Sequence, residues 1–147
     1  MGEDGGFWDG KKMVMMCEYD GSVVLGTHEG RLFKYVPGDL VPKEMECPGL
    51  QDTYIRCLCV VGGKLWVGTY KGIFVVDGQT GSSVCLTHNG ENVQSLSDNV
   101  VCAFYADEDS GLWVGTMYGG VDYMPCPDVH FSKYMTGNVR HFPERVK

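Results

Sequence analysis

The apolar positions of this chain fall in short runs that end at glycine, and the clearest of them, Leu112–Thr116, reads Leu-Trp-Val-Gly-Thr. The same five letters recur at Leu65–Thr69, and Val23–Thr27 keeps their shape with aliphatic residues in place of the tryptophan. The 21 glycines leave no long stretch with helical periodicity. This pattern predicts strands joined by hairpins, and the three copies predict a repeat protein.

The spacing of the copies indicates which repeat architecture to expect. Gly26 and Gly68 are 42 positions apart, Gly68 and Gly115 are 47 apart, and residues 13–35 align without a gap with residues 55–77. Repeats of roughly 40 to 50 residues that each form a four-stranded sheet are typical of β-propeller blades. We therefore predict an all-β chain of about three four-stranded antiparallel blades. That is an incomplete propeller by itself, because closed rings have about four to eight blades.

The predicted blades divide the chain into five segments. These are an N-terminal segment or remnant strand at 1–12, blade 1 at 13–52, blade 2 at 53–98, blade 3 at 99–136 and a C-terminal tail at 137–147.

Turn signals set the strand limits expected within each blade. Blade 1 is expected to have strands at 13–17, 22–27 and 31–36, with at most a short, irregular fourth strand in 39–51. Blade 2 is expected between 54 and 87, with turns at 62–63, 71–72 and 80–81, and a polar surface loop at 88–98. Blade 3 is expected to have its inner strand at 100–106 and further strands at 112–117, 121–124 and 130–134.

The repeated motif is interpreted as structural. Leu112 and Val114 point to one face of a strand and Trp113 to the other, so both faces carry apolar bulk, as expected for blades stacked around an axis. Gly115 is expected to allow the close approach of a neighbouring backbone or of a large ring such as Trp113, and the tryptophans are expected to pack in the core. The residues assigned to this structural motif are Gly26, Thr27, Trp66, Gly68, Thr69, Asp107, Gly111, Trp113, Gly115 and Thr116.

The charge balance limits the expected partners. The chain has 12 Lys and Arg against 19 Asp and Glu, a formal net charge of −7, whereas nucleic-acid binding needs clustered positive charge. No DNA or RNA partner is therefore expected. The sequence contains no apolar run of about 18 residues, the length needed to span a membrane. Residues 1–6 lack the basic and apolar regions of a signal peptide, so sequence outside this chain would have to direct export.

The seven cysteines are interpreted as buried thiols rather than as a disulfide framework. Their number is odd, and Cys17, Cys57, Cys59 and Cys102 lie in apolar strand runs, where a free cysteine behaves as a small hydrophobic residue. The alternative is a zinc site on Cys57-x-Cys59, whose side chains share a strand face, but zinc usually needs a second ligand pair. None is evident in the sequence.

No other pattern predicts a metal, a cofactor or catalysis. Asp107, Asp109 and Gly111 have the alternate spacing of a calcium loop, but the later acidic ligand is absent and turn formation is the preferred interpretation. Glu44 and Glu46 are expected to be solvated in a loop beside prolines. The four histidines form no close-spaced pair, and no serine or cysteine lies in a nucleophile motif. We therefore expect a chain that is not an enzyme.

The turns that follow the Gly-Thr pairs are the candidate ligand-binding positions. In a closed ring, equivalent turns gather on one face, where aromatic rings can stack on sugars while polar groups fix hydroxyls. The candidates are His28, Tyr70, Lys71, Met117 and Tyr118. The alternative is that these are ordinary hairpin residues.

The third copy resembles the two-component regulator propeller repeat. The residues that carry the resemblance are Asp98-Asn99-Val100-Val101, Asp107, Gly111 to Thr116, Gly119-Gly120-Val121 and His130-Phe131-Ser132-Lys133-Tyr134. The resemblance covers about three repeats, roughly residues 13–135. The second copy lacks the acidic turn and the double glycine, and the first also lacks the tryptophan.

This resemblance implies a non-catalytic, periplasmic sensor segment of a Bacteroides-type hybrid two-component system histidine kinase. It also implies recognition of a glycan or oligosaccharide, relayed through a homodimer of the parent protein to a kinase that lies outside this chain. The expected partners are therefore an oligosaccharide and either the remaining propeller blades or further copies of this chain. Two alternative functions are a protein–protein interaction scaffold and a fragment of a propeller enzyme such as a lyase or hydrolase.

Overall fold

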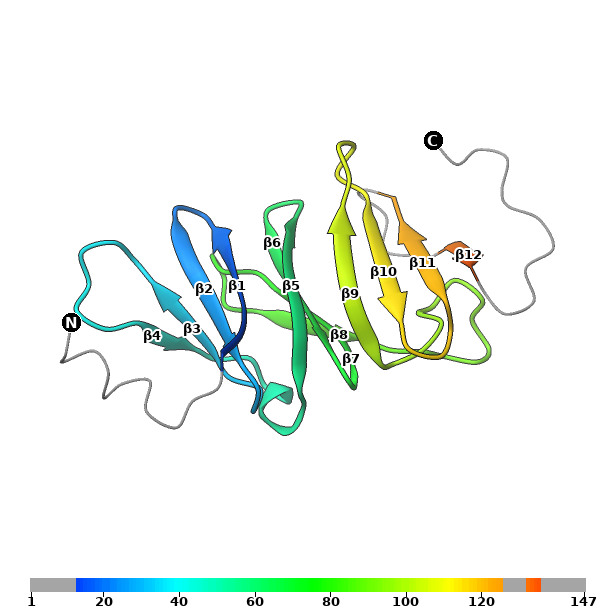
Figure 1. Ribbon diagram of the computed structural model, residues 1–147, viewed down its shortest axis with the longest axis horizontal. Coiled ribbons are helices and arrows are strands. Elements are labelled where there is room, and N and C mark those ends of the chain that lie inside the picture. Colours follow the sequence, from blue (N-terminus) through cyan, green and yellow to red (C-terminus); the bar gives the residue numbers. More distant parts are fainter. Residues whose placement is uncertain (1–12, 126–131, 136–147) are drawn as a thin grey trace.

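Three four-stranded antiparallel sheets stand side by side in the computed structural model, which describes residues 13–125 and 132–135 (Figure 1). The first sheet contains β1 (Met13–Tyr19), β2 (Ser22–Thr27), β3 (Leu32–Tyr35) and β4 (Lys43–Met45). The second contains β5 (Ile55–Val61), β6 (Lys64–Thr69), β7 (Gly72–Val76) and β8 (Ser83–Leu86). The third contains β9 (Val101–Ala106), β10 (Leu112–Thr116), β11 (Val121–Met124) and β12 (Ser132–Met135). The prediction of an all-β chain with three four-stranded blades is confirmed.

Strand order follows chain order in every sheet, as expected for successive hairpins. In blade 1 the short β4 is followed by a single 3-10 turn at Leu50–Asp52, which leads into the second sheet. The fourth strand of the third sheet, predicted at 130–134, includes Ser132–Met135. The predicted segments 1–12 and 137–147, together with His130 and Phe131, lie outside the described residues, and the predicted segment boundaries remain predictions.

The tight hairpins form where the sequence supplies residues that accept a positive φ. Asp20 and Gly21, which join β1 to β2, have φ angles of 55° and 78°. Gly62 and Gly63 join β5 to β6 at 62° and 79°. Two successive left-handed residues match the twist of the flanking strands, which is why such pairs favour two-residue hairpins.

The first strands of the three sheets form the inner edge of the assembly. β5 lies between β1 and β9 and contacts both (Figure 1). The prediction that residues 100–106 hold the inner strand of blade 3 therefore matches β9. The repeated motif forms the second strand of its sheet, which is β2, β6 or β10.

Two apolar cores lie between neighbouring sheets. The core between the first and second sheets includes Val24, Leu32, Leu58, Leu65 and Val67. The core between the second and third includes Cys57, Trp66, Ile73, Val101, Leu112 and Val114. The second sheet is thus covered on both faces, and all five residues of β7 are buried. Burial of an aliphatic or aromatic side chain stabilises the fold by about 1.5 to 3 kcal/mol, so these two contacts hold the blades together.

The tryptophans of the two identical motif copies lie in different surroundings. Trp66 is 6% exposed because its face of β6 packs against the third sheet. Trp113 is half-buried and packs on Tyr123, with 4.6 Å between ring centroids. Its neighbour across the strand pair, Tyr105, is 66% exposed. The prediction of core packing therefore holds for Trp66, whereas Trp113 faces away from the second sheet.

The motif glycines differ in the same way. A Cβ atom at Gly68 would lie 2.5 Å from Cys57 Sγ and 2.8 Å from Val101 Cγ1, so only glycine fits there without a shift. At Gly115 the nearest atoms, on Ala103, would be 3.9 Å away. The close approach expected at Gly115 is absent among the described residues, because that strand face has no neighbouring sheet there.

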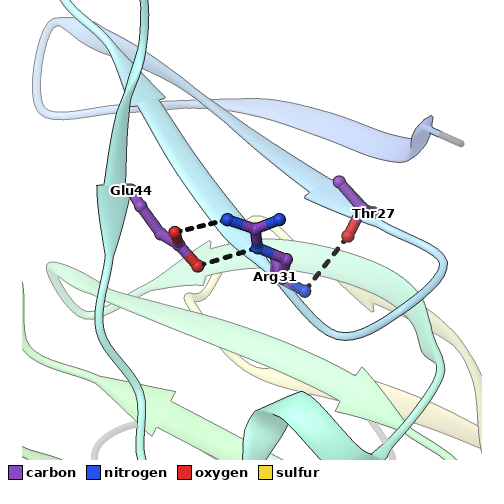
Figure 2. Close-up of polar contacts among 3 residues, drawn as sticks. All are labelled: Thr27, Arg31 and Glu44. Atoms are coloured by element: carbon purple, nitrogen blue, oxygen red, sulfur yellow. Dashed lines mark hydrogen bonds and ion pairs between the residues drawn. The ribbon is translucent and has the colours of Figure 1, made fainter. Parts of the chain in front are cut away.

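The motif threonines close the turns that follow them. Thr69 Oγ1 donates to Gly72 O at 2.8 Å and accepts from the Lys71 N–H at 2.9 Å. Thr116 Oγ1 makes the equivalent bonds to Gly120 O and from the Gly119 N–H. In the first sheet, Thr27 Oγ1 accepts from the Arg31 N–H at 3.1 Å (Figure 2).

The acidic approach to the third motif is a hydrogen-bonded turn. Asp107 Oδ1 accepts from the backbone N–H groups of Asp109 and Gly111 at 2.9 and 2.8 Å. Its Oδ2 accepts from the Tyr123 hydroxyl at 3.1 Å. A Cβ atom at Gly111 would collide with that hydroxyl, which explains the glycine.

The loop predicted to lie on the surface at 88–98 is buried at its end. Leu96 is 1% exposed and packs in the core between the second and third sheets. The next residue, Ser97, donates from its backbone N–H and its hydroxyl to the buried carboxylate of Asp122, at 2.8 and 2.5 Å. The prediction was wrong for this end because Leu96 packs between two sheets and Ser97 bonds to Asp122 of β11, and the local polar composition does not indicate these contacts.

Candidate functional site

An aromatic cluster of His28, Tyr54 and Tyr70 lies where the first and second sheets meet. The rings of His28 and Tyr54 are stacked, with centroids 4.9 Å apart and an interplanar angle of 23°. Tyr54 and Tyr70 meet edge to face, with centroids 5.3 Å apart. Tyr54 therefore joins two turns that belong to different blades.

Hairpin geometry places these rings together. His28 directly follows β2, Tyr70 directly follows β6, and Tyr54 directly precedes β5. The Tyr70 N–H donates to Tyr54 O at 3.3 Å, which continues the β5–β6 pairing by one residue. Since β5 is the inner strand next to the first sheet, its N-terminal end brings Tyr54 to the turn that carries His28.

Arg56 fixes the orientation of Tyr70. Its Nη1 donates to the Tyr70 hydroxyl at 2.8 Å, and its guanidinium carbon lies 5.5 Å from the centre of the Tyr70 ring. Arg56 lies on β5, and Tyr70 directly follows the neighbouring strand β6. The ring is therefore held in place before any ligand arrives, which reduces the entropy lost on binding.

A cavity of about 450 Å³ adjoins the cluster. Its lining residues are Glu29, Gln51, Thr53, Tyr54, Tyr70 and Lys71. Two aromatic faces thus stand beside an ammonium, a carboxylate and an amide. This set can stack on an apolar ring face and can donate to and accept from hydroxyl groups, which are the requirements of a small polar ligand.

A second hollow of about 310 Å³ lies between the start of β3 and the region after β4, and an ion pair forms part of its wall. Arg31 Nε and Nη2 donate to the two carboxylate oxygens of Glu44 at 3.0 and 2.7 Å (Figure 2). The hydrogen bond to Glu44 raises the pKa of Arg31 above its ordinary value. Glu44 was predicted to be solvated in a loop. Its side chain is exposed, as predicted, but it lies on β4, where its direct partner on β3 is Phe33 and its carboxylate reaches Arg31 just before β3.

The structure brings together some of the predicted ligand-binding residues. His28 and Tyr70 are in the aromatic cluster, and Lys71 lines the adjoining cavity. Met117 and Tyr118 lie in the turn after β10, where their backbone N–H groups donate to Val100 O and Asp98 Oδ2. Within residues 13–125, no ring contact or side-chain hydrogen bond joins these two residues to the cluster.

Sequence reasoning missed Tyr54, Arg56 and Gln51. A signal was present in the alternation Tyr54-Ile55-Arg56, in which a buried isoleucine separates two side chains on the other strand face. This alternation indicates that both side chains are accessible. It does not indicate which turn they contact, because the contact between His28 and Tyr54 joins two different blades.

The described residues contain no group of three or more His, Cys, Asp and Glu side chains that could hold a metal ion. Cys57 and Cys59, the alternative zinc pair, are both in the core region between the second and third sheets. The site chemistry is therefore that of aromatic faces and hydrogen-bonding groups.

Residues 95–118 match the family model described as Two component regulator propeller. Two crystal structures of the extracellular domain of BT4673 from B. thetaiotaomicron resemble the chain, with 30% and 31% identity and TM-scores of 0.69 and 0.66. They align with 77% and 74% of this chain. The chain thus contains a two-component regulator propeller repeat. BT4673 is described as a one-component system with one of these structures and as a hybrid two-component system with the other.

A third structure shows the same fold over a larger share of this chain. The extracellular domain of the hybrid two-component system BT3049 from B. thetaiotaomicron has a TM-score of 0.70 over 84% of this chain, at 21% identity. The chain spans 15%, 14% and 18% of the three solved chains, respectively. No curated protein matches it.

All three of these structures are extracellular domains. The two BT4673 domains, at 30% and 31% identity, agree with the periplasmic location that the resemblance implied. No helix among the described residues has the length and apolar character needed to cross a membrane.

Proposed function

We propose that this chain is a non-catalytic ligand-recognition segment of the sensor propeller of a hybrid two-component system, and that the aromatic cluster binds a glycan. The observation that carries the proposal is the stacking of His28 on Tyr54 and the edge-to-face contact of Tyr54 with Tyr70, beside a cavity whose lining also includes Glu29, Gln51 and Lys71. The kinase that receives the signal, and the homodimer that relays it, belong to the longer parent protein.

The chemistry of a sugar ring matches this arrangement. A pyranose ring has an apolar face of C–H groups that packs on an aromatic ring, while its hydroxyls both donate and accept hydrogen bonds. Tyr54 and Tyr70 supply the aromatic surface. Lys71 can donate, Glu29 can accept and Gln51 can do both, and all three line the same cavity. 

A ring that holds this site needs more blades than these three. The face of the third sheet that carries Tyr105, Trp113 and Tyr123 is equivalent to the face of the second sheet that carries the buried Trp66. A further sheet of the parent propeller covers that face in this proposal. Self-association of the chain is the alternative, and light scattering over a range of concentrations separates them, since a folded monomer at every concentration excludes the alternative.

The experiment that tests glycan binding is a screen of the 147-residue chain on an oligosaccharide array, followed by calorimetry on each hit. Tyr54→Ala and Tyr70→Ala each remove one stacking ring, which is worth about 0.5 to 1.5 kcal/mol. We expect each to weaken binding by about 2-fold to 10-fold. Tyr118→Ala is the matched control, because it removes an exposed tyrosine from the equivalent turn of the third blade.

Three outcomes contradict the proposal. Equal weakening by Tyr118→Ala and Tyr54→Ala would show that the loss is unrelated to the cluster. Binding of a macromolecular partner without any glycan binding would favour the scaffold function instead. Turnover of an oligosaccharide by the chain would favour the enzyme fragment. Circular dichroism of each variant confirms that the fold is retained.

A further inference from the structure

Cys47 lies at the contact between the first and second sheets. It follows β4, is 4% exposed, and packs in the core cluster that contains Phe74 and Val76 of β7. The chain after Cys47 stays close to the face of β7 that carries Phe74, because a Cβ atom at Gly49 would be 3.6 Å from the Phe74 ring. The connection between the two sheets is therefore laid against β7.

The register of β7 and β8 places Cys85 on that same surface. Cys85 is the direct partner of Phe74, and Ser83 is the direct partner of Val76. Directly opposed residues in antiparallel strands point to the same face, with Cβ atoms about 4.5 to 5.5 Å apart. Cys85 and Ser83 thus project toward the first sheet, where Cys47 is packed.

The electrostatic environment of Cys47 agrees with this placement. Burial raises the pKa of the Cys47 thiol, a hydrogen bond with the Ser83 hydroxyl lowers it, and the charge of a neighbouring Cys85 thiolate raises it. Cys85 is the exposed member of the six described cysteines. A reagent in solution can therefore reach the Cys85 thiol, which lies 3.9 Å from Lys71 O, whereas Cys47 is buried on the same side of the second sheet.

We propose that Cys47 and Cys85 form a disulfide bond in the periplasmic protein, linking the connection after β4 to the outer strand of the second sheet. The periplasm supports this chemistry because it keeps secreted cysteines oxidised. The bond adds a covalent link to the apolar contacts that hold the first and second sheets together.

The oxidant is a periplasmic thiol oxidase that carries a disulfide. The Cys85 thiolate attacks one oxidase sulfur, which forms a mixed disulfide and releases the other oxidase sulfur as a thiolate. The Cys47 thiolate then attacks the Cys85 sulfur, forming the protein disulfide and expelling the second oxidase thiolate. Two protons leave the protein thiols, and two electrons pass to the oxidase, which ends as a dithiol.

Peptide mapping tests the proposal on the full chain, exported to the periplasm by a fused leader and purified without reductant. The protein is unfolded in guanidinium chloride with a maleimide and digested with trypsin and chymotrypsin. We expect a Cys47–Cys85 cross-linked peptide in the wild type, with maleimide on Cys57. Incubation with dithiothreitol before labelling should release both thiols and lower the urea midpoint of unfolding.

Variants make the assignment specific. Cys85→Ser should abolish the cross-linked peptide and leave Cys47 labelled, whereas Cys59→Ser, at a partly buried core position, should leave the cross-link unchanged. Maleimide on both Cys47 and Cys85 in the unreduced wild type would overturn the proposal, as would a disulfide from Cys47 to any other cysteine. The readout does not depend on glycan binding, so it stands or fails independently of the proposed function.

Discussion

Gly68 lies against Cys57 so closely that a methyl group at position 68 would stand 2.5 Å from the Cys57 Sγ atom. The contact is part of the core between the second and third sheets. Gly68→Ala has to displace the thiol and Val101, and overpacking of a core costs about 1 to 3 kcal/mol. We expect a loss of stability in this range, measured by urea unfolding at constant m-value.

Gly115→Ala is the matched control, because it changes the same letter of an identical five-residue motif. The nearest atoms to the added Cβ, on Ala103, are at ordinary contact distance, 3.9 Å. Alanine also loses less chain entropy than glycine in a strand, so a small gain of about 0.5 kcal/mol is expected. Equal destabilisation by both variants would contradict the different packing of the two motif copies.

The Tyr19 hydroxyl connects the first sheet to two turns of the second. It donates to Gly63 O at 3.1 Å and accepts from the Gly78 N–H at 2.9 Å. Tyr19→Phe leaves a partly buried carbonyl and N–H without this partner, and we expect a loss of about 0.5 to 1.5 kcal/mol of unfolding free energy. Tyr35→Phe, at a half-buried position of β3, should change the urea midpoint little, and a larger effect there would argue against the inter-sheet role of Tyr19.

Asp107 makes the stability of the third sheet depend on pH. Burial acts to raise the pKa of its carboxyl, but the hydrogen bonds from Gly111, Tyr123, Asp109 and Trp113 together lower it below the ordinary value. A folded-state pKa below the unfolded one favours the folded state above the unfolded pKa of about 3.9. That contribution is lost as the pH falls through the folded pKa.

The expected result is a fall in the thermal midpoint of the wild type as the pH drops below about 4. Asp107→Asn keeps an acceptor for the turn but does not titrate, so its midpoint should depend less on pH in this range. Asp109→Asn, at an exposed position of the same turn, is the comparison. If the thermal midpoints of the wild type and Asp107→Asn changed with pH in the same way, Asp107 would not be a source of the pH dependence of stability.

Cys57 should be unreactive in the folded protein. Burial, with smaller effects of Cys102 and Cys59, raises the pKa of its thiol to about 12. Only the thiolate reacts with alkylating reagents, and a raised pKa keeps the group protonated at every pH below it. At pH 8 with reductant present, iodoacetamide should label exposed Cys85 and leave Cys57 unlabelled in mass spectra. Comparable labelling of the two cysteines in the native state would show that the core around Cys57 opens.

The sequence alone determined the repeat, the strands and most of the turns. These features follow from local causes: the alternation of side chains along a strand, and residues such as Asp20 and Gly21 that accept a positive φ. The family resemblance followed from the spacing and letters of the third copy. Of the candidate site, the sequence indicated His28, Tyr70 and Lys71, because each follows a Gly-Thr pair.

The tertiary structure decided what each repeated letter contacts. Trp66 and Trp113 have identical local sequence, yet only Trp66 is covered by a neighbouring sheet. The joining of His28 to Tyr70 through Tyr54, and the burial of Ser97 against Asp122, also link residues from separate segments of the chain. Local pattern fixes which face of a strand a side chain occupies, whereas the packing of whole blades fixes what lies on that face.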